Sequence, residues 1–254
     1  MPGEIFKRKV IKMARVIKKP EDVFAEITAD FNKAFGKDML SLILYGSGAD
    51  GTYLPGESDL NFLVILTDEG IKDLDRAFEV VKKWHKCRVA TPLFLTKNYV
   101  LSALDSFPVE FYGIRRNHIL VYGEDFMSEL AIESGDLRLQ LERELKAKIL
   151  HLRQGFLESE GKAKDLRHLI SISLKSFIAL FRALLFLKCN AVPVGKREIV
   201  LAVVRAYMLD ESIFDKCLDV GEGKDRFSTG DIRSLFKAYM EEIDKLSNIV
   251  DRME

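Results

Sequence analysis

Apolar positions follow two different patterns along the chain, and the change between them comes about halfway. Before it, a continuous apolar run at residues 42–45 is typical of a strand that is covered on both faces, and residues 60–66, apolar except for Asn61, predict a second strand. A third strand is predicted at residues 88–96, and helical spacing of apolar residues predicts helices at 20–35 and 68–86. The first half of the sequence therefore predicts a sheet with helices packed on it.

The predicted helices of the first half have recognisable ends and apolar faces. Pro20 suits the first turn of a helix and Gly36 suits its end, because a first-turn N–H has no helical partner and glycine tolerates left-handed backbone. A basic amphipathic helix is also expected at Ile5–Lys19, packed on the domain, with a membrane-surface or nucleic-acid role as the alternative. The face of the 68–86 helix that is expected to be buried consists of Ile71, Leu74, Phe78, Val81 and Trp84.

In the second half, few strand patterns remain and long helical periods follow. They predict an antiparallel bundle of helices at 137–159, 162–188, 196–209 and 229–254. The polar, glycine-containing segment 219–228 is expected to be a flexible loop. The expected bundle core includes Leu169, Ile172, Leu174, Phe177, Leu180 and Phe181. The sequence thus predicts an α+β fold in two domains, residues 1–132 with the sheet and residues 133–254 with the bundle.

Composition argues against several classes of protein. With 254 residues, 48% apolar and 31% charged, the chain is long enough for two ordinary globular domains. Lys plus Arg and Asp plus Glu both number 39, so no overall positive field indicates a dedicated nucleic-acid binder. Three widely spaced cysteines indicate neither a disulfide framework nor a zinc site. There is no signal peptide pattern, and Arg182 interrupts the longest apolar run, so a cytoplasmic protein without a membrane span is expected.

Candidate chemistry lies where the first two apolar runs meet a glycine-rich segment. Gly46, Ser47 and Gly48 carry no large side chain, so the backbone N–H groups there can approach an anion such as a phosphate. In the strand that follows, Asp59 and Asn61 project from one face because side chains alternate with period two. A carboxylate and an amide are therefore expected beside a phosphate-binding turn.

These residues resemble the motif of the nucleotidyltransferase superfamily, the fold shared by DNA polymerase beta and the aminoglycoside nucleotidyltransferases. The family motif is a glycine and a serine after a strand, a spacer, and two acids that flank one apolar residue at the start of the next strand. Gly46, Ser47 and Asp59 match this motif, whereas Asn61 stands where the family has its second acid. The resemblance implies the nucleotidyltransferase fold, followed by a helical domain.

In the family, a third acid on a neighbouring strand completes a site for two Mg²⁺ ions. Residues 91–95, where that acid is expected, contain no carboxylate, and Glu110 is the nearest substitute. Mg²⁺ prefers oxygen ligands and shares them with substrate phosphates. The resemblance therefore implies that Asp59 and Asn61 hold one or two Mg²⁺ ions weakly, because an asparagine oxygen supplies no charge.

The activity that the resemblance implies is transfer of a nucleoside monophosphate from a nucleoside triphosphate, such as ATP, to a hydroxyl acceptor. The acceptor is a small molecule or a macromolecule, and a homodimer is one assembly to test. By analogy with the family, the acceptor binds between the two domains, close to Lys146, Arg153 or Lys196. Because Asn61 weakens the acidic site, the alternative is a non-catalytic nucleotide-binding or protein-interaction module that retains the fold.

Two other phosphate-binding motifs overlap the same glycines. Residues 46–51 fit the pattern G-x-G-x-x-G with Asp68 downstream, but Pro55 and Gly56 interrupt the crossover helix that a dinucleotide-binding fold needs. A P-loop requires a lysine directly before its hydroxyl residue, and none precedes Thr52. A glycine hairpin without a ligand stays open as the simplest alternative.

Overall fold

The computed structural model describes residues 16–189 and 192–253 of the chain. The helix expected at Ile5–Lys19 falls almost entirely outside these residues. Contacts between residues group the chain into two compact units. The first unit runs up to Tyr99 and also includes Asn117–Phe126, and the second consists of Val100–Arg116 and the chain from Met127 onward. The predicted domain boundary at residues 132 and 133 stays a prediction.

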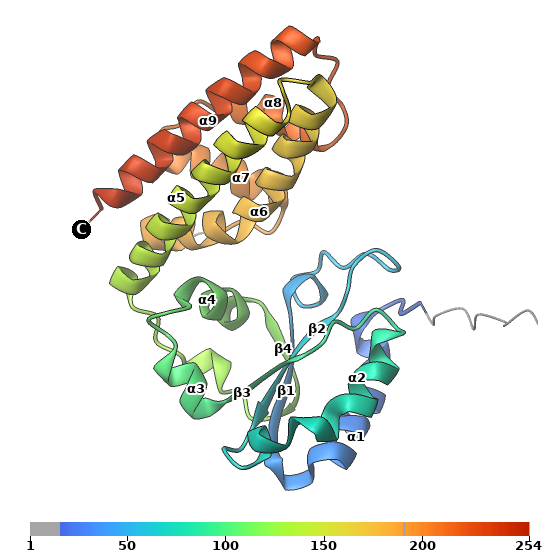
Figure 1. The fold of residues 1–254 in the computed structure, drawn as a ribbon. Coiled ribbons are helices and arrows are strands. Elements are labelled where there is room, and N and C mark those ends of the chain that lie inside the picture. The colour runs from blue at the N-terminus through green and yellow to red at the C-terminus, as the bar shows by residue number, and fades with distance from the viewer. Residues whose placement is uncertain (1–15, 190–191, 254) are drawn as a thin grey trace, which may run out of the picture. The chain divides into compact units, whose positions relative to one another are not determined.

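A mixed sheet forms the centre of the first unit (Figure 1). Its strands have the order β3-β2-β1-β4 and the bounds β1 Met39–Tyr45, β2 Asn61–Leu66, β3 Leu93–Thr96 and β4 His118–Gly123. Strand β1 pairs antiparallel with both β2 and β4, and β2 pairs parallel with β3. The two central strands are those predicted from the apolar runs, and nearly all their residues are buried.

One face of the sheet is covered by the helix that the sequence predicts before the first strand. A 3-10 turn at Pro20–Val23 leads into α1, Phe24–Phe35, and Gly36 follows with a φ of 54°. These ends confirm the predicted roles of the proline and the glycine. The shared core of helix and sheet consists of Ile27, Phe31 and Phe35 on α1 with Leu42, Leu44, Phe62, Val64 and Leu66 on β1 and β2.

The predicted helix at residues 68–86 is shorter than expected, and its predicted buried face is wrong in part. The segment Gly70–Ala77 is a 3-10 helix, and only α2, Phe78–His85, is α-helical. Asp73 interrupts the first part with φ −114° and ψ 49°, which changes the rotation of the side chains beyond it. As a result Phe78 is 69% exposed, whereas Trp84 is buried as predicted and Ala77 is buried as well.

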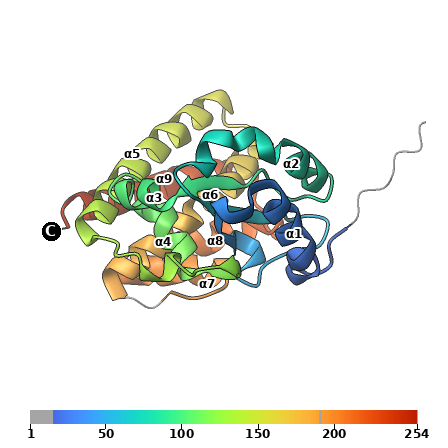
Figure 2. The same ribbon diagram turned by 90° about the horizontal axis from the view of Figure 1, so that it is seen from below.

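The second unit is helical, as predicted for the latter part of the chain (Figure 1). Its longest helix, α6, packs against five others and contributes the centre of the core (Figure 2). The described helices are α4 Pro108–Arg116, α5 Ser134–Glu158, α6 Ala163–Cys189, α7 Lys196–Ala206, α8 Glu211–Gly221 and α9 Thr229–Asp251. Short segments at Lys97–Ser102 (α3) and Met127–Glu129 complete the helical elements that follow β3. With the sheet of the first unit, this confirms the predicted α+β fold.

Among the described residues, α6 is the single helix that is long and apolar enough to span a bilayer, since an 18-residue window within Ala163–Lys188 has a mean hydropathy of 1.9. Half of that window is buried inside the structure. Phe177, Phe181 and Leu184 are fully buried in the core that α6 shares with its neighbours. Its apolar character is therefore accounted for by its central place among the helices of the second unit.

Two expectations for the helical unit need correction. The helix α8 was not predicted, and the segment 219–228, predicted as a loop, begins inside it. Two local features indicate this helix: apolar residues at helical spacing from Ile213 to Val220, and Asp210, which caps it by accepting a hydrogen bond from the Ser212 backbone. In the expected core, Ile172 is 44% exposed, whereas Phe177 and Phe181 are buried as predicted.

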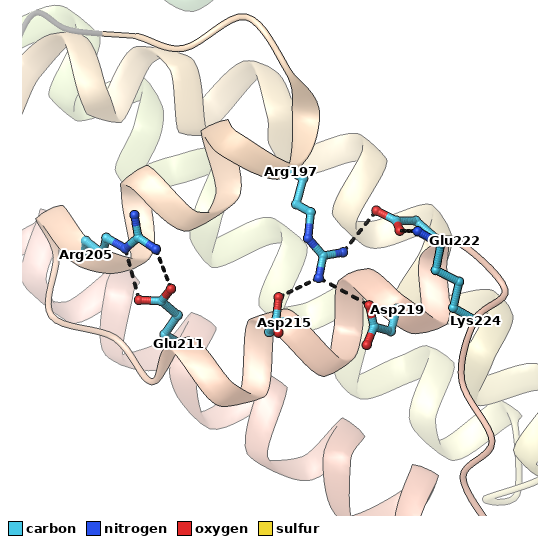
Figure 3. A network of polar contacts seen from close by, with 7 residues as sticks. All are labelled: Arg197, Arg205, Glu211, Asp215, Asp219, Glu222 and Lys224. Atoms are coloured by element: carbon cyan, nitrogen blue, oxygen red, sulfur yellow. Dashed lines mark hydrogen bonds and ion pairs between the residues drawn. The ribbon is translucent and has the colours of Figure 1, made fainter.

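Polar contacts from Arg197 and Arg205 join α7 to α8, and Arg197 contacts the larger group of carboxylates (Figure 3). The Arg197 guanidinium contacts Asp215, lies 3.2 Å from Asp219 Oδ1, and lies 3.1 Å from Glu222 Oε1. Lys224 also pairs with Glu222 at 2.6 Å. The three carboxylates come from successive turns on one side of α8 and its end, so Arg197 offsets their mutual repulsion.

Candidate functional site

A glycine turn follows β1 at the place that the sequence indicates. Gly46–Gly48 forms one 3-10 turn, closed by hydrogen bonds from the backbone N–H groups of Ala49 and Asp50 to the Gly46 carbonyl at 2.9 and 3.0 Å. Gly46 has a φ of 73°, which L side chains rarely adopt. Gly48 is buried so tightly that a Cβ there would lie 3.0 Å from Leu60 Cδ2. The turn is therefore pressed against the start of β2, and it needs glycine at both positions.

Asn61 lies directly beside this turn. It is the register partner of Tyr45 across β1 and β2, and Tyr45 in turn pairs with His118 on β4. A Cβ placed on Gly46 would come within 3.3 Å of the Asn61 Nδ2 atom. The structure thus brings together two predicted site residues, Gly46 and Asn61. Burial of the Tyr45 phenol next to them raises its pKa.

Asp59 lies two positions before Asn61 and is paired with an arginine. The Arg88 Nε atom is 3.2 Å from Asp59 Oδ1, and both side chains are about half exposed. The same guanidinium donates from Nη2 to the Glu57 carbonyl at 2.7 Å. Asp59 and Asn61 flank Leu60, which is fully buried, so they project from the opposite face of the strand.

The backbone fixes Arg88 beside this strand. Leu60 donates a hydrogen bond to the Arg88 carbonyl at 3.0 Å and accepts one from the Ala90 N–H at 2.9 Å. Arg88 itself has a φ of 61°, an uncommon value for a residue with a side chain. Arg88 has no place in the family motif. It is the first residue of the segment 88–96 that the sequence predicts as the third strand, whereas β3 begins only at Leu93.

The acid expected on the third strand has no counterpart in β3. Leu93–Thr96 contains no carboxylate. Glu110 lies instead on α4 in the second unit, where its Oε2 accepts a hydrogen bond from Gln140 Nε2 at 2.8 Å. Gln140 also accepts a bond from the Val109 backbone at 2.9 Å, which ties α4 to α5. A structural role therefore accounts for these contacts, and a role for Glu110 in the chemistry stays a prediction.

The donor set around Asp59 does not fit a pair of Mg²⁺ ions. Asp59 supplies a carboxylate that Arg88 already pairs with, and Asn61 supplies a neutral oxygen. Mg²⁺ sites in proteins are built on carboxylates together with substrate phosphates. Among residues 16–189 and 192–253, no group of three or more His, Cys, Asp or Glu side chains is placed to hold a metal ion. The family's two-ion arrangement is therefore not reproduced by these residues.

The basic residues suggested for the acceptor have partners or neighbours of their own. Lys146 pairs with Glu142 at 2.6 Å, and Arg153 pairs with Asp244 at 3.2 Å. Lys196 lines a small cavity between α6, α7 and α8. These contacts explain all three side chains as parts of helix surfaces, and an acceptor-binding role stays a prediction.

Comparison with solved structures gives separate evidence for the fold. The chain resembles spectinomycin adenyltransferase AAD(9) from Enterococcus faecialis, whose crystal structure contains ATP and spectinomycin. The TM-score is 0.53 at 13% sequence identity, and the match covers 91% of this chain and 99% of the other. No protein-family model and no curated protein sequence matches the chain. Identity this low establishes the fold alone: the chain has the nucleotidyltransferase fold that its glycine turn and second strand predict.

Proposed function

We propose that the glycine turn and the start of β2 bind a nucleoside triphosphate, and that the protein transfers the nucleoside monophosphate to a hydroxyl acceptor. The observation that carries this proposal is the packing of Asn61 Nδ2 against Gly46 at the end of β1. The Asn61 amide donor therefore lies beside a turn whose glycines carry no side chain that would block a ligand. The nucleotide and the small-molecule acceptor in the similar adenyltransferase structure support the same assignment.

Each group near the turn has a role in this proposal. The backbone N–H groups of Ser47 and Gly48 and the Asn61 amide would donate to phosphate oxygens, which fixes the phosphate chain in one orientation. The acceptor hydroxyl oxygen then attacks the α-phosphorus, the bond from the α-phosphorus to the bridging oxygen breaks, pyrophosphate leaves with that oxygen, and the hydroxyl proton passes to solvent. Phosphoryl transfer depends mainly on positioning and on charge stabilisation, so the site acts by holding the reacting atoms in line.

A second candidate function is nucleotide binding without transfer. Two observations favour it: Asn61 in place of an acid, and the pairing of Asp59 with Arg88. Both lower the negative charge that a catalytic metal ion needs. In this case the fold would serve as a nucleotide sensor or as an interaction module.

A transfer assay separates the two candidates. The protein is incubated with nucleoside triphosphates labelled in the base, with Mg²⁺, and with a panel of hydroxyl acceptors that begins with spectinomycin, and mass spectrometry detects acceptors that gain a nucleoside monophosphate. Transfer that is lost in Asp59→Asn supports the enzyme. If only Asn61→Asp produces transfer, the natural site is a weakened enzyme. Nucleotide binding with no transfer by either protein favours the binding module.

A further inference from the structure

Arg88 brings a positive charge to Asp59, two residues before the asparagine that lies beside the glycine turn. We infer that the Arg88 guanidinium binds the nucleotide phosphates directly, in the role that a divalent cation has in related folds, so that nucleotide binding does not require Mg²⁺. This inference rests on the proposed nucleotide site and names the group that carries its positive charge. Among the described residues, Arg88 is the cation that pairs with Asp59, two residues before Asn61.

The local charge balance supports the inference. A site with two or three carboxylates repels a triphosphate and needs divalent ions to accept it. Here Arg88 offsets the charge of Asp59, and Asn61 adds none. An added divalent ion at Asp59 would have to displace the guanidinium or bind within its repulsive field. The phosphates, by contrast, meet a cation that is already in place.

The Arg88 guanidinium can pair with a phosphate in addition to Asp59. A guanidinium stays charged at any physiological pH, and its planar fork pairs with phosphate oxygens in bidentate geometry. The contacts to Asp59 and to the Glu57 carbonyl use only part of its N–H donors. Arg88 is 48% exposed, so a ligand can reach the remaining donors.

The backbone holds Arg88 at the right place along the strand. Its carbonyl is bonded to the Leu60 N–H at 3.0 Å, and Leu60 Cδ2 in turn contacts the turn at Gly48. Asp59 lies just before β2, which starts at Asn61, and two residues of extended chain span about 6.7 Å. The guanidinium on Asp59 and the amide on Asn61 would therefore contact different phosphate groups of one triphosphate.

The test compares nucleotide binding in EDTA and in Mg²⁺ by calorimetry, with ATP as the probe. For the wild type we expect affinities that agree within about threefold between the two conditions. Arg88→Asn removes the charge, and asparagine tolerates left-handed backbone. In EDTA it should weaken ATP binding by roughly tenfold or more, the usual effect of losing a charged hydrogen bond. Arg88→Lys keeps the charge and should lose less.

Arg76→Asn is the matched control. Arg76 also lies in the first unit, lies 3.0 Å from Asp38 Oδ2, and donates to a backbone carbonyl at 2.7 Å. Removing it deletes the same kind of contacts away from the turn, so ATP binding should stay within about twofold of the wild type. An equal loss of affinity in both variants would overturn the inference, because it would report general destabilisation.

A second readout uses a metal ion alone. Asn61→Asp supplies the family's second acid, and Arg88→Asn removes the charge that opposes a metal. We expect Mn²⁺, followed by electron paramagnetic resonance, to bind the double variant at least about tenfold more tightly than Asn61→Asp alone. Equal Mn²⁺ binding by the two proteins would contradict a metal-opposing role for Arg88.

The outcomes separate this inference from the function on which it rests. ATP binding that is abolished by EDTA in the wild type, and is unchanged in Arg88→Asn, would overturn the inference and leave the proposed nucleotide site standing. Absence of ATP binding in both conditions would overturn both. Binding in EDTA that falls in Arg88→Asn, and not in Arg76→Asn, would support both.

Discussion

Arg88 Nε lies 3.2 Å from Asp59 Oδ1, so the candidate site contains a carboxylate that is already paired with an arginine. Both side chains are about half exposed, and exposed pairs of this kind contribute less than about 1 kcal/mol to stability. The pair therefore determines the charge of the candidate site much more than it determines the stability of the fold.

The first prediction concerns that small stability effect. Arg88→Asn should change the free energy of unfolding by less than about 1 kcal/mol, because it removes an exposed pair and asparagine accepts the backbone of this position. Urea unfolding followed by circular dichroism measures the change. A loss of several kcal/mol would show that Arg88 holds the sheet together, and its effect on nucleotide binding would then be indirect.

The second prediction concerns the Arg197 cluster on α7 and α8 (Figure 3). Arg197→Met leaves the carboxylates Asp215, Asp219 and Glu222 without their shared cation, and like charges close together repel. We expect a loss of about 1–2 kcal/mol in the free energy of unfolding, partly restored by high salt. Arg205→Met is the matched control, since Arg205 is 65% exposed and pairs with Glu211 alone. Equal losses in the two variants would contradict a special role for Arg197.

The third prediction concerns the segment after α8, which Arg167 ties to α6. Arg167 Nε donates to the two Asp225 oxygens at 2.9 and 3.2 Å, and its Nη2 donates to the Phe227 carbonyl at 2.6 Å. The Asp225 side chain is only 5% exposed. The hydrogen bonds from Arg167 lower the pKa of Asp225, outweighing its burial, which raises it.

Because the folded-state pKa of Asp225 is lowered, its contribution to stability is present above the ordinary aspartate pKa of about 3.9 and is lost as the pH falls through the lowered value. Asp225→Asn should cost about 1.5–3 kcal/mol at pH 7 and should make unfolding less sensitive to acid. Urea unfolding at several pH values between 7 and 3 measures both effects. A variant as acid-sensitive as the wild type would show that Asp225 does not carry this linkage.

The fourth prediction distinguishes two cysteines. Burial raises the pKa of the Cys217 thiol to about 12, so it should not react with a thiol reagent at pH 8 while the protein is folded. Cys87 is only partly buried and should react under the same conditions. The measurement uses a Cys189→Ser background and mass spectrometry of the labelled peptides. Labelling of both thiols at similar rates would indicate that the core around Cys217 opens readily.

The central strands and the long helices could be predicted because each has a strong local pattern. The apolar runs gave β1 and β2, and the helix before them ends at Gly36 as predicted. The spacing of Gly46 and Asp59 also indicated the fold that the structural comparison supports. Each of these features depends on residues that are close together in the sequence.

The parts that the sequence did not predict depend on contacts between distant residues or on a single backbone angle. The non-helical Asp73 turns Phe78 outward, and no periodicity shows this. Arg88 was missed because its left-handed backbone and its pairing with Asp59 arise only when Leu60 and Ala90 meet across the sheet. Helix α8 is an exception, because its apolar residues have helical spacing and its Asp210 cap is also a local feature.

A pair of glycine variants tests whether a nucleotide binds at the glycine turn. Gly46 and Gly51 have similar φ values of 73° and 81°, so alanine is strained at both. A Cβ on Gly46 meets Asn61 Nδ2 at 3.3 Å, whereas one on Gly51 meets nothing within 4 Å. In calorimetric titrations with ATP and the other nucleoside triphosphates, Gly46→Ala should weaken binding by about tenfold and Gly51→Ala by less than about twofold. Equal affinities in the two variants, or no binding by the wild type, would contradict nucleotide binding at this turn.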